Sequence, residues 1–197
     1  MKKEINILKS LIYLSCELMN ILPPLIYFVD YTNAIRLYDK HLNIISYDYR
    51  DIGFHVYNVL LIPKENTVYI NLSILKDMKK AYILIIRETR RLYQLEEISR
   101  YSHNIATHEN KELLQSWLHS YRIYNTNKTY NIIAPPELDC NVYSTYLMKT
   151  IFHIRLNFEV KFDKKEETRK FNERYLYISM IYNQNKILEL ANKYKLL

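Results

Sequence analysis

AYILIIRETRRLYQ, residues 81–94, is the stretch of sequence on which the fold depends most. Its apolar side chains recur at the spacing of a helix with one buried face, which predicts a helix over residues 78–98. Glu88 falls in the middle of this apolar stripe, four residues from both Leu84 and Leu92. A carboxylate on a buried face is costly unless it is paired or the face lines a cleft. Glu88 is therefore the first candidate site residue, and Arg87 and Arg91 stand on the edge of the same stripe.

A second acidic residue lies in an apolar stripe of PELDCNVYSTYLM, residues 136–148. A pair of prolines marks the start of a predicted helix over residues 136–152, because proline is well placed in the first helical turn. An acid at a helix start is favoured by the helix dipole, which is the ordinary explanation for Glu137 taken alone. Two acids and two arginines on successive helices are less easily explained in that way. The apolar partners of Glu137 on its predicted face are Cys140, Ser144, Leu147, Met148 and Ile151.

The remaining patterns describe a small sheet followed by helices. The N-terminal twenty residues predict an amphipathic helix that ends before Pro23, and the charge run at residues 164–174 predicts a solvated helix surface. The other predicted elements are strands at 25–29, 56–62 and 67–72, the last two as a hairpin, a helical turn at 34–41, a helix at 110–124, an extended piece at 156–162 and a helical tail from Lys164. We therefore predict an α+β fold: a small, mostly antiparallel sheet packed on a helical core, with a C-terminal helical extension. One domain is expected, with residues 1–155 as its α+β part and 156–197 as the extension.

Composition narrows the class of protein. The chain has 197 residues, a net charge of +7 and a single glycine. One glycine cannot build a phosphate-binding P-loop or a dinucleotide-binding glycine motif. Cys16 and Cys140 lie far apart and are expected to be reduced thiols in a cytoplasmic protein. No apolar run approaches the roughly 20 residues that span a bilayer, so no membrane partner is expected.

The two helical stretches together resemble the ImmA/IrrE-type zinc metallopeptidases over about residues 25–152. In that family a helix with HExxH is followed by a later helix with ExxANxFA. The pentapeptide Arg87-Glu88-Thr89-Arg90-Arg91 takes the HExxH place, and the later motif begins at Glu137. The resemblance also implies that the strand at 67–72 is the edge strand that runs past the active-site helix. It further implies that Glu137 corresponds to the third zinc ligand and Glu88 to the general base.

The departures from the family pattern change the expected chemistry. Both histidine positions are arginine here, and a guanidinium group has no lone pair to donate to zinc. We therefore expect no metal, no cofactor and no catalytic residue, with Glu88 as the catalytic base only if the protein is active. Our hypothesis is that Arg87 or Arg91 pairs with Glu137, and also with Glu88, so that a guanidinium replaces the missing dication.

Three functions are compared on this basis. The first is a catalytically inactive, metallopeptidase-like protein that binds a protein or ribonucleoprotein partner. The resemblance and the AT-rich codons of its abundant residues imply a phage or mobile-element regulator, or an anti-CRISPR-like inhibitor of a host defence nuclease. The second is a zinc-dependent peptidase with rearranged ligands, using Glu88 with His103, His108 or His119. The third is a basic nucleic-acid-binding module whose face includes Arg90, Arg100, Lys79 and Lys80. The sequence does not predict an oligomeric state.

Overall fold

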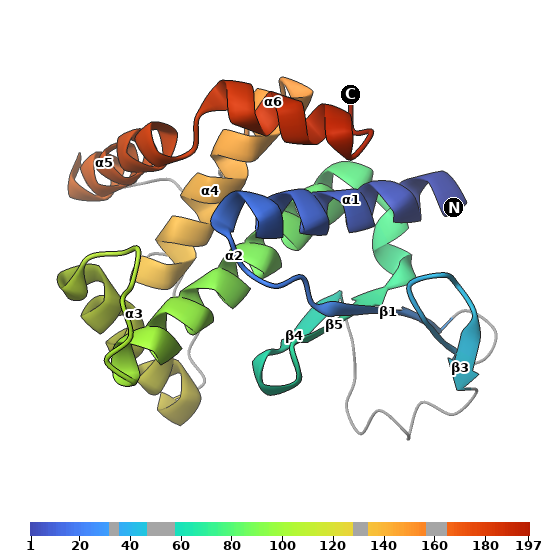
Figure 1. Ribbon diagram of the computed structural model, residues 1–197, viewed down its shortest axis with the longest axis horizontal. Helices are drawn as coiled ribbons and strands as arrows, with labels where there is room; N and C mark the ends of the chain where they lie inside the picture. The colour runs from blue at the N-terminus through green and yellow to red at the C-terminus, as the bar shows by residue number, and fades with distance from the viewer. Residues whose placement is uncertain (32–35, 47–57, 128–133, 157–164) are drawn as a thin grey trace.

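The computed structural model describes residues 1–31, 36–46, 58–127, 134–156 and 165–197. The described helices are α1 (Lys2–Met19), α2 (Met78–Ser102), α3 (Lys111–Asn127), α4 (Pro135–Phe152), α5 (Lys165–Ile181) and α6 (Gln184–Lys193). The described strands are β1 (Leu25–Asp30), β2 (Arg36–Tyr38), β3 (Ile44–Ser46), β4 (Val59–Ile62) and β5 (Thr67–Asn71). The fold is α+β, as predicted, and α1 and α2 lie over one face of the sheet (Figure 1).

The sheet is mixed, with the strand order β3-β2-β1-β5-β4. β1 and β5 are parallel, whereas the other pairs are antiparallel, so the prediction of a mostly antiparallel sheet is confirmed. The β4–β5 hairpin is also confirmed, with Ile62 opposite Thr67 and a left-handed Asn66 in the turn. β5 is an inner strand, however, and its outer neighbour is β4, so the expectation that residues 67–72 form the edge strand is wrong.

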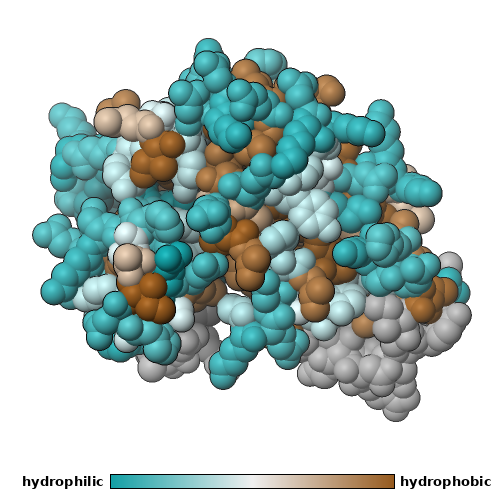
Figure 2. Space-filling model, viewed as in Figure 1, coloured by the Kyte–Doolittle hydropathy of each residue, from teal (hydrophilic) through white to brown (hydrophobic). Residues whose placement is uncertain are grey.

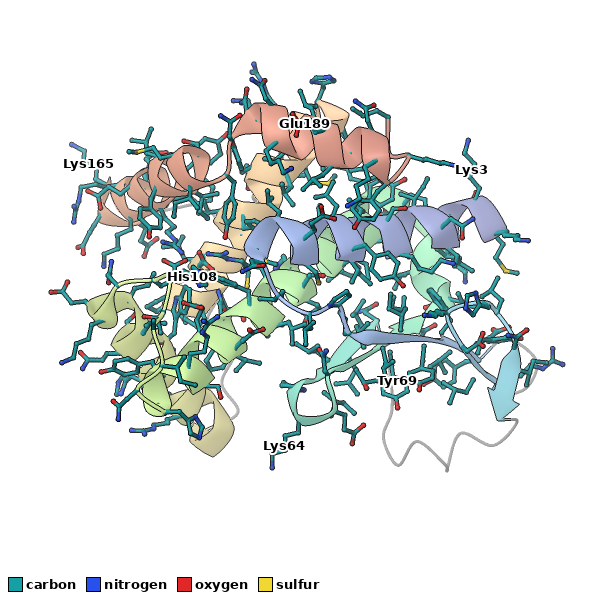
Figure 3. All side chains as sticks on the ribbon, in the orientation of Figure 1. Lys3, Lys64, Tyr69, His108, Lys165 and Glu189 are labelled. Carbon is teal, nitrogen blue, oxygen red and sulfur yellow. The ribbon has the colours of Figure 1, made fainter. Side chains whose placement is uncertain are left out.

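The two faces of the central strands differ because side chains alternate along a strand. Phe28 and Ile70 belong to the buried core. Tyr27 and Tyr69 point to the opposite face, where their rings stack with centroids 5.2 Å apart. Figure 3 shows Tyr69 on the side of the sheet away from α1 and α2. The sheet therefore contributes one apolar face to the helical core.

One local prediction fails for an identifiable reason, and the predicted helical tail is confirmed as two helices rather than one. The helical turn expected around residues 34–41 is contradicted where the structure describes it, because Arg36–Tyr38 forms a strand paired with β1. Tertiary pairing overrides the local preference there. The helical tail is divided into α5 and α6, and the side chain of Asn183 caps α6 by accepting from the Asn185 amide at 2.8 Å. The expected extended piece at 156–162 lies outside the described residues, apart from Leu156.

The C-terminal helices share the core of the rest of the molecule. Ile178 of α5 and Ile187 of α6 are fully buried and belong to the same apolar cluster as Leu8 of α1. Outside the core, Lys193 Nζ approaches Glu17 Oε2 to 2.6 Å and ties α6 to α1. Figure 2 shows apolar side chains between α6 and α1, with polar side chains over most of the same face. In the part of the chain that the structure describes, no helix is long and apolar enough to cross a membrane.

Candidate functional site

The residues predicted from the HExxH-like pattern meet between α2 and α4. Arg87 Nη2 donates to Glu137 Oε2 at 2.7 Å, and Arg91 Nη2 donates to the other oxygen, Oε1. Arg91 Nη1 also donates to Glu88 Oε1 at 2.5 Å. The four-residue spacing on α2 places both arginines over the first turn of α4, where Glu137 lies. The structure therefore has the pairing that the sequence hypothesis requires; we call these four residues the Arg87–Glu137 cluster.

The Arg87–Glu137 cluster is neutral in sum and partly shielded from water. Its side chains retain 11–21% of their exposure, and two guanidinium groups face two carboxylates. Burial lowers the pKa of Arg91, but the neighbouring Glu88 and Glu137 outweigh it and raise that pKa above its usual value. Burial also raises the pKa of the nearby Cys140 thiol, which therefore stays protonated and is a poor nucleophile. These charges are suited to holding α2 against α4.

The donor set at this position does not fit zinc. Both places where the family has an imidazole hold a guanidinium group, and the carboxylate of Glu137 is already engaged by both arginines. A hollow beside Glu88, lined mainly by apolar side chains, has room for about one water molecule and not for a peptide. Among the described residues, the cluster therefore lacks the ligands of a zinc peptidase site.

The rearranged zinc site is not assembled either. Among the described residues, no group of three or more histidine, cysteine or acidic side chains is placed to hold a metal ion. His108 Nδ1 lies 3.0 Å from Glu97 Oε1, and His103 Nδ1 lies 2.8 Å from the Ser99 carbonyl oxygen. The alternative in which Glu88 shares a metal with His103, His108 or His119 therefore finds no support among the described residues.

Arg90 lies in a second, deeper cluster that the sequence patterns did not indicate. It was expected on an exposed basic face, but its side chain is 0% exposed, so that expectation is wrong. Each of its five N–H groups has an acceptor within the interior. The acceptors are Asp139 Oδ2 at 2.8 Å and Oδ1 at 3.1 Å, Glu109 Oε1 at 3.1 Å, Tyr182 Oη at 2.9 Å and Met19 Sδ at 3.6 Å.

Arg174 of α5 completes this interior cluster. Its Nε donates to Asp139 Oδ1 at 2.7 Å, and its Nη2 donates to Glu109 Oε1 at 2.9 Å. Two arginines therefore face two carboxylates, and the charges cancel; we call these four residues the Arg90–Asp139 cluster. Burial raises the pKa of Asp139, but Arg90 and Arg174 outweigh it and hold that pKa at about 2. Asp139 is accordingly ionised at neutral pH.

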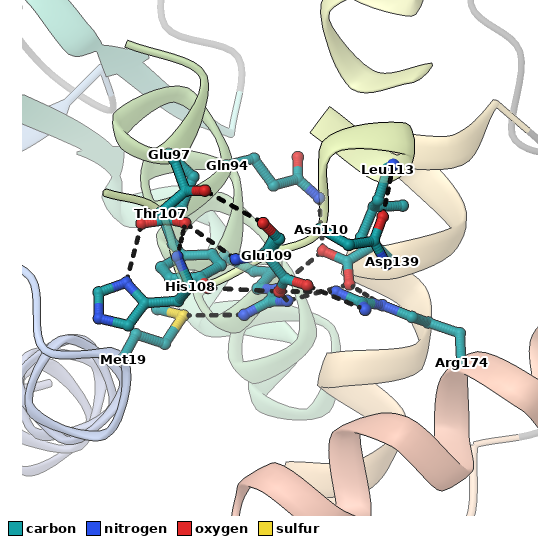
Figure 4. Close-up of polar contacts among 12 residues, drawn as sticks. Met19, Gln94, Glu97, Thr107, His108, Glu109, Asn110, Leu113, Asp139 and Arg174 are labelled. Atoms are coloured by element: carbon teal, nitrogen blue, oxygen red, sulfur yellow. Dashed lines mark hydrogen bonds and ion pairs between the residues drawn. The ribbon is translucent and has the colours of Figure 1, made fainter. Parts of the chain in front are cut away.

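Neighbouring polar groups fix the position of the two acids. Gln94 Nε2 donates to Asp139 Oδ2 at 2.6 Å. Glu97 Oε2 accepts from the backbone amides of His108 at 2.6 Å and Glu109 at 3.2 Å, so it shapes the segment that leads into α3 (Figure 4). The cluster thus joins α2, α4, α5 and the segment before α3.

A sequence signal for part of this cluster did exist. Arg174 is the last residue of the charge run at 164–174, which was expected to be solvated as a whole. It also lies three residues after Phe171 and four before Ile178, on the apolar stripe of α5, so the helical period placed it towards the core. Glu109 lies outside the helices and follows no such period, so its role comes only from the tertiary fold.

The proposed basic face is not a single surface. Lys79 and Lys80 are exposed at the start of α2, and Arg100 lies near its end, where its Nε donates to the Ala106 carbonyl oxygen at 3.0 Å. Twenty residues of helix separate Lys80 from Arg100 by about 30 Å. With Arg90 buried between them, these residues do not form one binding patch.

No protein-family model, curated protein or solved structure matches this chain. The likeness to metallopeptidases therefore depends on Arg87, Glu88, Arg91 and Glu137, and on the helix pair that carries them.

Proposed function

We propose that this chain is a catalytically inactive, metallopeptidase-like protein that acts in the cytoplasm by binding a protein or ribonucleoprotein. The observation that carries the proposal is the double contact of Glu137, whose two oxygens accept from Arg87 and Arg91. In the resemblance to the metallopeptidases, those three residues correspond to two histidine ligands and a third, acidic ligand. Guanidinium groups supply positive charge that pairs with the carboxylates there, but they cannot supply a Lewis acid.

The same contacts remove the general base from use. A base must accept a proton from an activated water, and Glu88 Oε1 is already held by Arg91 Nη1 at 2.5 Å. A scaffold with this site recognises a partner without cutting it. Related metallopeptidase-like proteins occur on phages and mobile elements. By this analogy we propose that the chain is a regulator, or an inhibitor of a host defence nuclease.

Metal analysis of purified protein tests the geometry behind this proposal. We expect the native chain to carry no stoichiometric zinc and to cleave no peptide when zinc is added. We expect the double variant Arg87→His/Arg91→His to bind about one zinc ion per chain, because two imidazoles four residues apart on a helix then face Glu137. Adding Glu137→Gln should abolish that binding, and Arg87→Gln/Arg91→Gln is the matched control without ligands.

Two results would count against the proposal. Stoichiometric zinc in the native chain that is lost on Glu137→Gln would favour the rearranged peptidase. A folded histidine variant without zinc would show that the helix pair lacks metallopeptidase geometry. Capture of partners from host cells, with and without nuclease treatment, then separates a protein partner from a ribonucleoprotein.

A further inference from the structure

A groove of about 900 Å³ lies at the end of the molecule away from the Arg87–Glu137 cluster. It is bounded by the first half of α1, the start of α2, the end of α4 and the segment after α6. Phe152 in its wall and Glu137 lie fifteen residues apart on α4, which corresponds to about 22 Å along the helix. The groove is therefore a separate feature, and its capacity to bind a ligand does not depend on the proposed function.

The charge of the groove is positive. Among the described side chains that line it, those of Lys2, Lys3, Lys9 and Lys195 are basic and none is acidic, and Glu17 lies beside it in contact with Tyr194. Burial lowers the pKa of Lys9 and the neighbouring charge of Lys2 lowers it further, whereas Asp39 raises it. Lys9 Nζ also donates to the Lys40 carbonyl oxygen at 3.0 Å. Lys3 stands clear of the ribbon at the start of α1 (Figure 3). An anionic ligand would relieve the repulsion between Lys2 and Lys9.

The walls of the groove carry aromatic rings as well as lysines. Tyr82 of α2 stacks on Phe152 of α4, with ring centroids 4.8 Å apart and ring planes 17° from parallel. Tyr13 of α1 and Tyr194 lie 6.3 Å apart. The Tyr194 hydroxyl donates to Glu17 Oε2 at 2.6 Å, which fixes its ring. All four rings are only partly buried and line the groove.

We propose that this groove binds a short stretch of single-stranded nucleic acid. Aromatic rings and flexible ammonium groups that line one groove match the two parts of a nucleotide, because bases stack on aromatic rings and phosphates pair with lysines. Paired bases of a duplex are stacked on one another and do not present their faces to such rings. A ligand with phosphates alone would use the lysines and leave the rings without a role.

Fluorescence anisotropy with a labelled single strand of about ten nucleotides tests the lysines. The triple variant Lys2→Gln/Lys3→Gln/Lys195→Gln should weaken binding about tenfold and reduce the slope of log affinity against log salt by about 2, since each phosphate contact contributes about 0.7. The control is Lys64→Gln/Lys111→Gln/Lys165→Gln, which removes the same charge from exposed sites elsewhere and should change affinity by less than about twofold.

A second arm tests the rings. Tyr82→Leu should weaken binding of the single strand about fivefold to tenfold while binding of inorganic polyphosphate is unchanged, because a base loses its stacking surface and a phosphate does not. Phe152→Leu is a second variant for the same contact, and thermal melting checks that both remain folded. Free mononucleotide should bind more weakly than the strand, because it meets only one or two lysines.

Several results would overturn the inference. The first two are an equal loss of affinity in the two triple lysine variants, and an affinity for duplex or polyphosphate as high as for the single strand. The other two are unchanged affinity in both ring variants, and no binding of the single strand at all. Zinc uptake by the histidine variant is a separate outcome, so the failure of one proposal is distinguishable from the failure of the other.

Discussion

Arg90 and Arg91 are neighbours in sequence but lie in different environments. Arg90 is 0% exposed and satisfies all its donors inside the protein, whereas the Arg91 side chain retains 21% exposure beside Glu88 and Glu137. A buried guanidinium is tolerated only when its charge is balanced and its hydrogen bonds are made. The consequence of losing either side chain therefore depends on which carboxylates are left without a donor.

Arg91→Ala should destabilise the fold by about 2–4 kcal/mol, because it removes the donor that Glu88 and Glu137 share and leaves their charge partly buried. Urea denaturation of the variant and the native protein measures the difference. Lys79→Ala, which truncates an exposed residue of the same helix, should change stability by less than about 0.5 kcal/mol. An unchanged transition midpoint for Arg91→Ala would show that these ion pairs contribute little.

The Arg87–Glu137 cluster could be predicted from sequence, whereas the Arg90–Asp139 cluster could not. Glu88 and Glu137 interrupt apolar stripes, so the helical period alone marks them as anomalies that need a partner. Asp139 lies two residues from Glu137 and carries no signal of its own, because its partners come from two other segments, α2 and α5. Sequence reasoning finds a charge that violates a pattern, but it does not find one whose burial depends on distant segments.

At the scale of elements, α5 is joined to the rest of the molecule by one charged side chain as well as by apolar packing. Arg174 reaches both acids of the interior cluster, and its guanidinium lies 4.6 Å from the centre of the Tyr177 ring. The other arginine of α5, Arg169, pairs with Glu173 on the surface and is 61% exposed. The helix thus offers a buried and a solvated arginine for direct comparison.

Arg174→Ala should destabilise the protein by about 3 kcal/mol, since it leaves two buried carboxylates facing Arg90 alone. Arg169→Ala should cost less than about 0.5 kcal/mol, because an exposed pair is screened by water. Hydrogen exchange gives a second measurement, in which amides of α5 and α6 should exchange faster in Arg174→Ala only. Equal effects of the two variants would mean that α5 is held by its apolar residues.

Helices and strands could be predicted from sequence where the spacing of their own apolar residues determines them. The long helices α2 and α4 and the β4–β5 hairpin follow directly from spacing and from the prolines beside them. β2 is a strand of three residues whose conformation comes from pairing with β1, so its sequence alone suggested a helical turn. The inner position of β5 likewise results from its pairing with β1, which is distant in sequence.

At the scale of the whole molecule, the interior cluster makes stability depend on acid. The folded pKa of Asp139, about 2, lies below its ordinary value of 3.8. Its ionised form therefore stabilises the fold at any pH above about 4, by roughly 2 kcal/mol, and this contribution is lost as the pH falls towards 2. Melting temperature should accordingly fall steeply between about pH 4 and pH 2.

The Asp139→Asn variant isolates this effect. It should be less stable at neutral pH and should show a shallower fall over the same acid range. Glu112→Gln, at an exposed residue of α3, provides the matched control and should keep the native profile. A native profile in Asp139→Asn would assign the acid sensitivity to other carboxylates.

The equal numbers of positive and negative charges in the Arg90–Asp139 cluster also limit how the sequence of this chain can change in evolution. An uncompensated ion is left inside the protein when Arg90, Glu109, Asp139 or Arg174 is replaced alone. A related sequence with different residues at these positions must therefore have replaced at least two of them together. Those four positions should therefore vary as a set across any lineage, while the solvated lysines and glutamates drift independently. Kinship to this chain is then best recognised by the joint presence of these four side chains, even where the surrounding letters have changed.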